Sequence, residues 1–130
     1  MKEIEVVAGI IFNPASTHVL LALRKPEQHQ GDRWEFPGGK IEAGEGLATA
    51  LARELHEEVG IVVKEANPRT IIEHSYPDKK VRLHFWDVTR FGGAPSGREG
   101  QQLQWVELEK LGELKFPDAN QAIVDTLTVG

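Results

Sequence analysis

The segment between Gly38 and Gly60 constrains the fold of this chain more than any other. Its residue pattern predicts a helix from about Gly46 to Val59, with Gly60 well placed as the residue that ends it. Apolar residues at helical spacing predict one buried face, made of Ala48, Leu51, Leu55 and Val59. An adjoining face carries Glu54, Glu57 and Glu58, within roughly 100° of one another. The helix must therefore lie between a core and a polar border.

Segments with strand character occur on both sides of this helix in the sequence. The expected strands are residues 3–12, 18–24, 70–76, 81–85 and 103–108. Turn signals lie at 13–16 and 77–79, residues 34–39 lead into a glycine-rich turn, and residues 92–100 form a loop. Asp118, followed three residues later by Gln121, predicts the cap of a second helix. This order predicts an α/β fold in which helices sandwich a mixed β-sheet.

Length and composition set the general class of protein. The 130 residues fit one domain, 1–130. Residues 6–12 form the longest nearly unbroken apolar stretch, which is far too short to span a bilayer, and no signal-peptide pattern is present. The absence of cysteine excludes disulfides and thiolate chemistry and fits a cytoplasmic location. The net charge of −5 argues against capture of a nucleic-acid backbone.

Negative charge is concentrated around the predicted helix. Residues 39–61 hold five glutamates against two basic residues, so they contribute −5 + 2 = −3. Like charges at these spacings repel, and a cation or raised carboxyl pKa values would relieve the repulsion. Mg²⁺ suits such a site because it takes oxygen ligands and is commonly shared with substrate phosphates. The alternative is an ordinary solvated helix face, since glutamate favours helices.

Arg53 is the only basic residue within the predicted helix. It precedes Glu57 by four residues, a spacing at which it can orient that carboxylate. Five histidines, His18, His29, His56, His74 and His84, show no metal-ligand spacing and are expected to be structural or surface residues. No Gly-x-x-x-x-Gly-Lys-Ser/Thr sequence is present, so a P-loop mechanism is excluded.

The spacing of the charged residues and glycines matches a known signature. Gly39 is followed after five residues by Glu45, and after seven more by Arg53-Glu54-Leu55-His56-Glu57-Glu58-Val59-Gly60-Ile61. This pattern resembles the Nudix box of hydrolases that act on nucleoside diphosphates linked to another moiety. The resemblance extends over essentially the whole chain to the MutT branch. It is carried by Gly9-Ile10-Ile11, residues 35–42, Phe85-Trp86, Glu99-Gly100-Gln101 and residues 116–120.

The resemblance implies a Nudix fold and a set of metal and catalytic residues. The implied Mg²⁺ ligands, with Mn²⁺ as an alternative ion, are Glu54, Glu57, Glu58, Glu99 and a backbone carbonyl of Gly38 or Gly39. Glu54 is the expected general base, with Glu99 as the other candidate and Arg53 as the orienting residue. Glu45 is expected to support the geometry between loop and helix.

The implied substrate contacts are Arg24, Phe36, Gly39, Lys40, Lys79 and Asn120. Lys40 has a surface lysine as its alternative reading, and Asn120 can instead support the C-terminal helix. Lys79 departs from the best-known MutT pattern, which has arginine at this position, and an ammonium group cannot reproduce the planar fork of a guanidinium.

The resemblance implies hydrolysis of an oxidised purine nucleoside triphosphate, 8-oxo-dGTP by preference, to the monophosphate and pyrophosphate. Such an enzyme sanitises the nucleotide pool and so prevents mutation. A small-molecule nucleotide is then the partner, without nucleic acid or membrane, and a monomer is expected. Two alternatives stay open: a Nudix hydrolase of CTP, ADP-ribose or dinucleoside polyphosphates, and a Nudix domain that binds nucleotide without catalysis.

Overall fold

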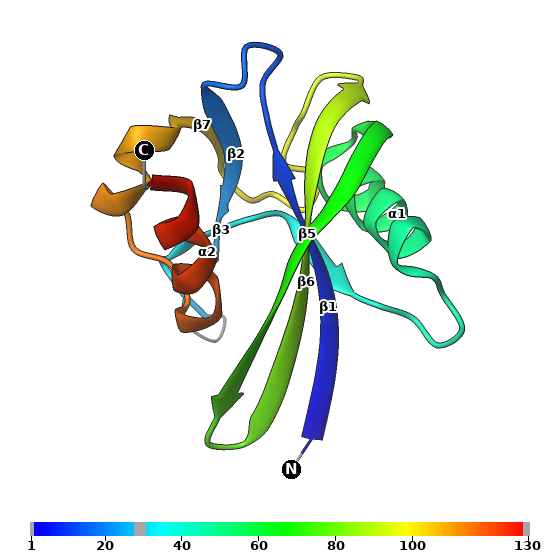
Figure 1. Ribbon diagram of the computed structural model, residues 1–130, viewed down its shortest axis with the longest axis vertical. Helices are drawn as coiled ribbons and strands as arrows, with labels where there is room; N and C mark the ends of the chain where they lie inside the picture. The colour runs from blue at the N-terminus through cyan, green and yellow to red at the C-terminus, as the bar shows by residue number, and fades with distance from the viewer. Residues whose placement is uncertain (1, 28–30, 129–130) are drawn as a thin grey trace.

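The computed structural model describes residues 2–27 and 31–128; within these, the side chains of residues 118, 119 and 128 are not described. Its elements are β1 (Lys2–Ile11), β2 (His18–Leu23), β3 (Trp34–Glu35), β4 (Gly38–Lys40), α1 (Leu47–Val59), β5 (Val62–Tyr76), β6 (Lys79–Gly92), β7 (Leu103–Glu107), the 3₁₀ helix η1 (Leu108–Glu113) and α2 (Asp118–Thr128). Figure 1 shows α1 and α2 on opposite sides of the strands. No helix among residues 2–27 and 31–128 is long and apolar enough to cross a membrane.

The strands form two sheets. The larger sheet has the order β4-β1-β6-β5, and it is mixed because β1 is parallel to β6 whereas β4 and β5 pair antiparallel to their neighbours. The smaller sheet, β3-β2-β7, is antiparallel. The expected α/β fold with a mixed sheet between helices is confirmed, and the division into two sheets is an additional finding.

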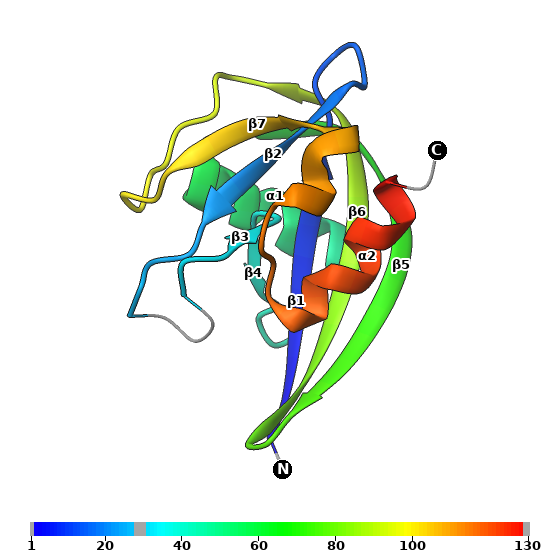
Figure 2. The same ribbon diagram turned by 90° about the vertical axis from the view of Figure 1, so that its left-hand side faces the viewer.

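Alternation along β1 separates two apolar clusters. Val7 and Ile11 pack on the side of α1, whereas Ala8 and Ile10 belong to the cluster that includes α2. Figure 2 shows α2 lying across the face of the larger sheet that is opposite to α1. Successive residues of a strand point to opposite faces, so one buried strand anchors both layers.

The helix α1 lies close to the predicted range. It ends at Gly60, whose positive φ of 75° favours glycine, and its buried residues are Ala50, Leu51, Leu55 and Val59. Ala50 thus replaces Ala48, which is exposed. The prediction of Ala48 was wrong because, although its helical spacing matches that of Leu51, Leu55 and Val59, it lies in the exposed first turn of α1.

The β5–β6 hairpin is longer than the sequence predicts. Its turn lies at residues 77–78 as expected, but β5 begins at Val62 rather than at Thr70. Pro68 concealed the first half because proline donates no ladder hydrogen bond. The strand accommodates Pro68 because β5 lies at the sheet edge and the register shifts between Pro68 and Thr70.

The glycine-rich segment is a strand rather than a turn. The chain bends at Pro37 and then pairs as β4 with β1, so the expected turn at residues 36–39 is corrected. A Cβ on Gly38 would collide with the carbonyl oxygen of Val7, which explains glycine at this close approach of two backbones. The helix α2 begins at Asp118, but the predicted cap by its side chain lies outside the described residues.

Candidate active site

One cavity of about 390 Å³ brings together most of the predicted site residues. The predicted residues in its lining are Arg24, Phe36, Gly38, Gly39, Lys40, Glu54, Glu58, Lys79, Glu99 and Asn120. Arg53 and Glu57 are not in the lining, and the Glu57 side chain is 56% exposed whereas that of Glu54 is 17% exposed. Glu54 and Glu58 therefore face the cavity, and Glu57 lies at the more solvated border of the carboxylate face.

Gly39 makes room for the Glu54 carboxylate. A Cβ built on Gly39 would overlap the carboxylate atoms of Glu54. Apart from Gly39 and its two chain neighbours, no backbone atom lies closer to that Cβ than these carboxylate atoms. The β4 strand carries Gly39 past the middle of α1, so the absence of a side chain lets this carboxylate lie directly on the strand.

Glu58 is held at the neighbouring position of β4. Its Oε2 accepts a hydrogen bond from the Gly38 N–H at 3.1 Å. The pKa of Glu58 is raised to about 8, first by burial and then by the charge of Glu35, against the opposing hydrogen bond from Gly38. Glu99 and Glu54 raise that pKa further. The negative charges of these carboxyl groups therefore disfavour ionisation of Glu58, and a bound cation would offset that effect.

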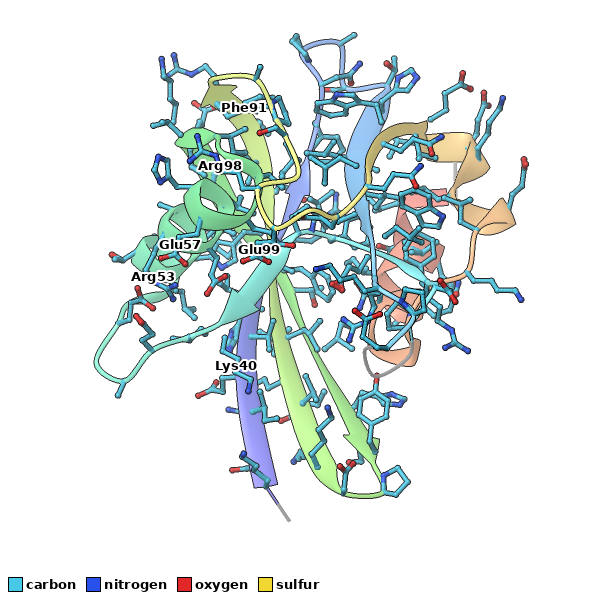
Figure 3. All side chains as sticks on the ribbon, turned by 180° about the vertical axis from the view of Figure 1, so that it is seen from behind. Lys40, Arg53, Glu57, Phe91, Arg98 and Glu99 are labelled. Carbon is cyan, nitrogen blue, oxygen red and sulfur yellow. The ribbon has the colours of Figure 1, made fainter. Side chains whose placement is uncertain are left out.

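Glu99 reaches this group from the loop that follows β6. The loop is bonded to the end of α1: Ser96 N–H donates to the Val59 carbonyl at 2.9 Å, and Arg98 N–H donates to the Glu58 carbonyl at 3.1 Å. Helix ends leave such carbonyls without intrahelical partners. Figure 3 shows Glu99 in this loop beside α1, which carries Arg53 and Glu57.

Arg53 joins the helix to the loop that precedes it. Its strongest contacts are to Glu45, with Nε–Oε2 at 2.7 Å and Nη2–Oε1 at 2.8 Å. It also donates to Glu54 at 2.8 Å and to Glu57 at 3.3 Å. The hydrogen bond from Arg53 lowers the pKa of Glu45 to about 2. Glu45 also accepts from the Glu42 N–H at 3.0 Å, which is the geometry expected of a residue supporting the loop.

Glu35 is a cavity residue that sequence reasoning missed. Arg24 donates to both of its carboxylate oxygens, at 2.6 and 3.2 Å. Burial raises the pKa of Glu35, and the Arg24 charge opposes that rise. Arg24 therefore meets the cavity already paired with a carboxylate. Position 35 directly precedes the glycine-rich segment, but no local signal shows that Glu35, at the end of β3, pairs with Arg24, which follows β2.

Asn120 and Phe36 lie on the α2 side of the cavity. Asn120 is 7% exposed, and its side chain makes no hydrogen bond among the described residues. Phe36 stacks on Phe116 at 5.9 Å and packs edge-on against Phe85, so its ring belongs to the core as well as to the cavity lining. A buried amide that makes no side-chain hydrogen bond within the described part of the chain, beside apolar walls, is suited to bind a planar polar ligand.

Lys79 also lines the cavity, from the β5–β6 hairpin. Its ammonium lies 5.7 Å from the centre of the Tyr76 ring, a cation–π distance. Tyr76, Ile4, Val6 and Val81 line the cavity as well and were not predicted as site residues. The long hairpin, visible at the lower end of Figure 1, thus contributes both a cation and apolar surface.

The donor atoms suit a hard divalent cation. Glu54, Glu58 and Glu99 offer carboxylate oxygens, and their mutual repulsion favours a positive ion. Within the part of the chain that the structure describes, no three His, Cys, Asp or Glu side chains form a metal-holding group by themselves. This arrangement fits an ion that completes its coordination with substrate oxygens and water.

None of the histidines that the structure describes lines the cavity with these carboxylates. His84 is buried and its Nε2 lies 3.0 Å from Glu5 Oε1, while His74 packs against Tyr76. His18 contacts Thr17, and His56 is exposed on α1. The expectation for His29 lies outside the described residues.

Comparison with known proteins identifies the family. The model of the NUDIX domain matches residues 7–126, and the chain therefore belongs to this family. It is 39% identical over 127 residues to the 8-oxo-dGTP diphosphatase of Escherichia coli (strain K12), covering 98% of each chain. It is also 38% identical over 117 residues to a CTP pyrophosphohydrolase of the same organism, covering 90% of this chain and 84% of the relative.

Solved structures agree with that assignment. A structure from work on MutT of Aliivibrio salmonicida and Vibrio cholerae superposes with a TM-score of 0.86 at 41% identity, covering 98% of both chains. The predicted resemblance to the Nudix family and its MutT branch is thus confirmed.

Proposed function

We propose that this chain is one Nudix hydrolase domain that converts 8-oxo-dGTP to 8-oxo-dGMP and pyrophosphate with Mg²⁺. The observation that carries the proposal is a single cavity in which carboxylates from α1 and the 93–101 loop meet a buried amide from α2. Charged phosphates and a purine base need these two environments at once. The similarity to 8-oxo-dGTP diphosphatases over nearly the whole chain supports the same substrate.

The reaction is hydrolysis at the β-phosphorus of the triphosphate. Water forms a bond to the β-phosphorus, and the bond from that phosphorus to the oxygen shared with the α-phosphate breaks. Pyrophosphate and the nucleoside monophosphate are the products. Glu54 accepts the proton of the attacking water, with Glu99 as the alternative base, because both carboxylates line the cavity.

The cation has a defined place in this proposal. Glu54, Glu57, Glu58, Glu99 and a carbonyl of Gly38 or Gly39 would hold Mg²⁺, or Mn²⁺ in its place. When bound, the ion neutralises phosphate charge and lowers the pKa of a coordinated water. Arg53 keeps Glu54 and Glu57 in position through its two hydrogen bonds. Lys40, Arg24 and Lys79 supply positive charge around the same cavity.

The base is read by the amide of Asn120. Its carbonyl accepts from the N7–H of 8-oxoguanine while its NH₂ donates to O6. Val6, Val81 and Leu83 provide apolar walls for a planar base. We propose that the enzyme acts as a monomer in the cytoplasm, where removal of oxidised precursors prevents their incorporation into DNA.

The test is a product analysis with 8-oxo-dGTP, dGTP, CTP and ADP-ribose, each with Mg²⁺ and with Mn²⁺. We expect 8-oxo-dGTP to have the highest kcat/KM and to yield the monophosphate and pyrophosphate. Highest kcat/KM with CTP would instead support the second candidate, which the similarity to a CTP pyrophosphohydrolase favours. Nucleotide binding without any product would support a non-catalytic domain.

A further inference from the structure

The side-chain amide of Gln101 connects two of the carboxylate-bearing residues through their backbones. Its Oε1 accepts from the Glu99 N–H at 2.9 Å. Its Nε2 donates to the Glu58 carbonyl at 3.1 Å. One planar group therefore joins the loop that carries Glu99 to the last turn of α1, across 43 positions of sequence.

The surrounding loop is shaped around this bridge. Gly97 O accepts from Gly100 N–H at 3.0 Å, which makes a tight turn with Glu99 inside it. The positive φ of Gly100, 82°, is the conformation that glycine adopts at least cost. A Cβ on Gly97 would collide with the carbonyl oxygen of Gln101, so the turn packs directly against the bridging residue.

Hydrogen bonds of the backbone, rather than contacts of the Glu99 side chain, fix this loop against α1. Glu99 itself is exposed, so burial of its own side chain does not hold it beside α1. Two hydrogen bonds at the Glu58 carbonyl, from Arg98 N–H and Gln101, together with the Glu99 N–H bond, hold the loop against the last turn of α1.

We propose that Gln101 is a positioning residue that holds the Glu99 carboxylate at the Glu58 end of the cavity before any cation is bound. The inference rests on the proposed function for the role of Glu99, but the bridge itself acts in the metal-free protein. Loss of the bridge lets the loop move away from α1, and the carboxylates then have to be drawn together when cation and substrate bind.

The test compares Gln101→Ala and the size-matched Gln101→Met with Gln102→Ala as the control. Gln102 is the exposed neighbour, and its side chain makes no hydrogen bond among the described residues. In metal-free protein, we expect both Gln101 variants to lose about three- to tenfold of the hydrogen-exchange protection of the Glu99 amide, the range for one modest hydrogen bond. The control keeps wild-type protection.

The second readout is the Mg²⁺ concentration that gives half-maximal hydrolysis. We expect it to rise about three- to tenfold in the Gln101 variants and to stay unchanged in Gln102→Ala. In a Glu99→Gln background, Gln101→Met should raise it by less than about twofold, because residues that act through one another are not additive. A full additional effect in that background would show a general structural role and overturn the inference.

The two proposals fail separately. Wild-type protein without hydrolysis of any nucleotide would overturn the proposed function, while the exchange measurement would still decide whether the bridge holds the loop. Unchanged Glu99 protection in a well-folded Gln101→Met variant would overturn the positioning role even if the enzyme is active. If Gln101→Ala does not fold, Gln101→Met supplies the comparison.

Discussion

The carboxylate of Glu54 lies in the space that a side chain on Gly39 would occupy. We predict that Gly39→Ala reduces kcat at least about 100-fold, because it would displace the carboxylate that we propose as the general base, and a displacement of about 1 Å in such a group has effects of this size. The atoms that must move are the end of a flexible side chain, so Tm should change by less than about 4 °C. Steady-state hydrolysis of 8-oxo-dGTP and a thermal melt of the same preparation measure both quantities.

Gly38→Ala is the matched control for that variant. Its new Cβ would meet the Val7 carbonyl and the Ala8 Cα, which are backbone atoms of the paired strand. We expect this variant to lose about 1–3 kcal/mol of unfolding free energy, the usual range for overpacking. Equal effects of the two substitutions on Tm would show that Gly39 is required by the fold and not by Glu54.

Glu54→Gln should lower kcat by about 10²–10⁴-fold, because the amide keeps the shape of the side chain but loses the basicity and charge. Glu57→Gln should also lower kcat by powers of ten. Its effect would come from weaker binding of the cation rather than from loss of the group that accepts the proton. Circular dichroism should show that both variants keep the fold. Near-normal turnover of either purified variant at saturating Mg²⁺ contradicts its assigned role.

The raised pKa of Glu58 predicts how the stability of the metal-free protein depends on pH. Its folded pKa of about 8 lies above 4.5, the usual value of a glutamate carboxyl. Such a group adds stability that is present below pH 4.5 and is lost as pH rises through about 8, since ionisation is disfavoured in the folded state. We therefore expect Tm, measured in chelator, to fall between pH 5 and pH 8.

Glu58→Gln tests this cause directly. The amide cannot ionise, so the variant should have a flatter dependence of Tm on pH and should melt above the wild type at pH 8. Glu57→Gln, which removes an exposed carboxyl of the same helix, is the control and should keep the wild-type slope. A Glu58→Gln variant whose Tm falls as steeply as that of the wild type would assign the slope to other groups.

Local patterns and distant contacts contributed differently to what could be predicted. The α1 carboxylate face follows from helical spacing alone, so Glu54, Glu57 and Glu58 were placed together correctly on one helix. The sequence could not show that Glu57 is largely exposed, because that depends on where β4 crosses the helix. Exposure of a helix face is decided by its neighbours, not by its own period.

Contacts between distant segments were beyond the reach of the same reasoning. An ion pair joins Glu35 to Arg24, and a hydrogen bond joins Gln101 to Glu58. The two residues of each pair come from different segments of the fold. Neither pair has a spacing that distinguishes it from surface residues. Glu99 was expected at the site only by resemblance to the family, and the bonds from its loop to the end of α1 supply the physical reason.

Asn120 is the residue on which the proposed base preference rests. It is buried in the cavity lining, and its backbone N–H donates to the Pro117 carbonyl at 2.8 Å, so its main chain serves the start of α2 while its side-chain amide is left for a ligand. Oxidised guanine presents a donor at N7 and an acceptor at O6, which match the two ends of that amide. Unmodified guanine presents two acceptors, which leaves one polar group unpaired at about 1–3 kcal/mol.

We therefore predict that Asn120→Ala lowers the ratio of kcat/KM for 8-oxo-dGTP over dGTP by about 5- to 150-fold, the equivalent of that energy. The half-maximal Mg²⁺ concentration should stay near the wild-type value, because Asn120 comes from α2 and the carboxylates from α1 and the 93–101 loop. The helix-support alternative predicts the opposite pattern: a lower Tm with an unchanged ratio. A well-folded variant with the wild-type ratio would show that Asn120 does not read the oxidised edge, and the preference would then have to come from other residues of the cavity.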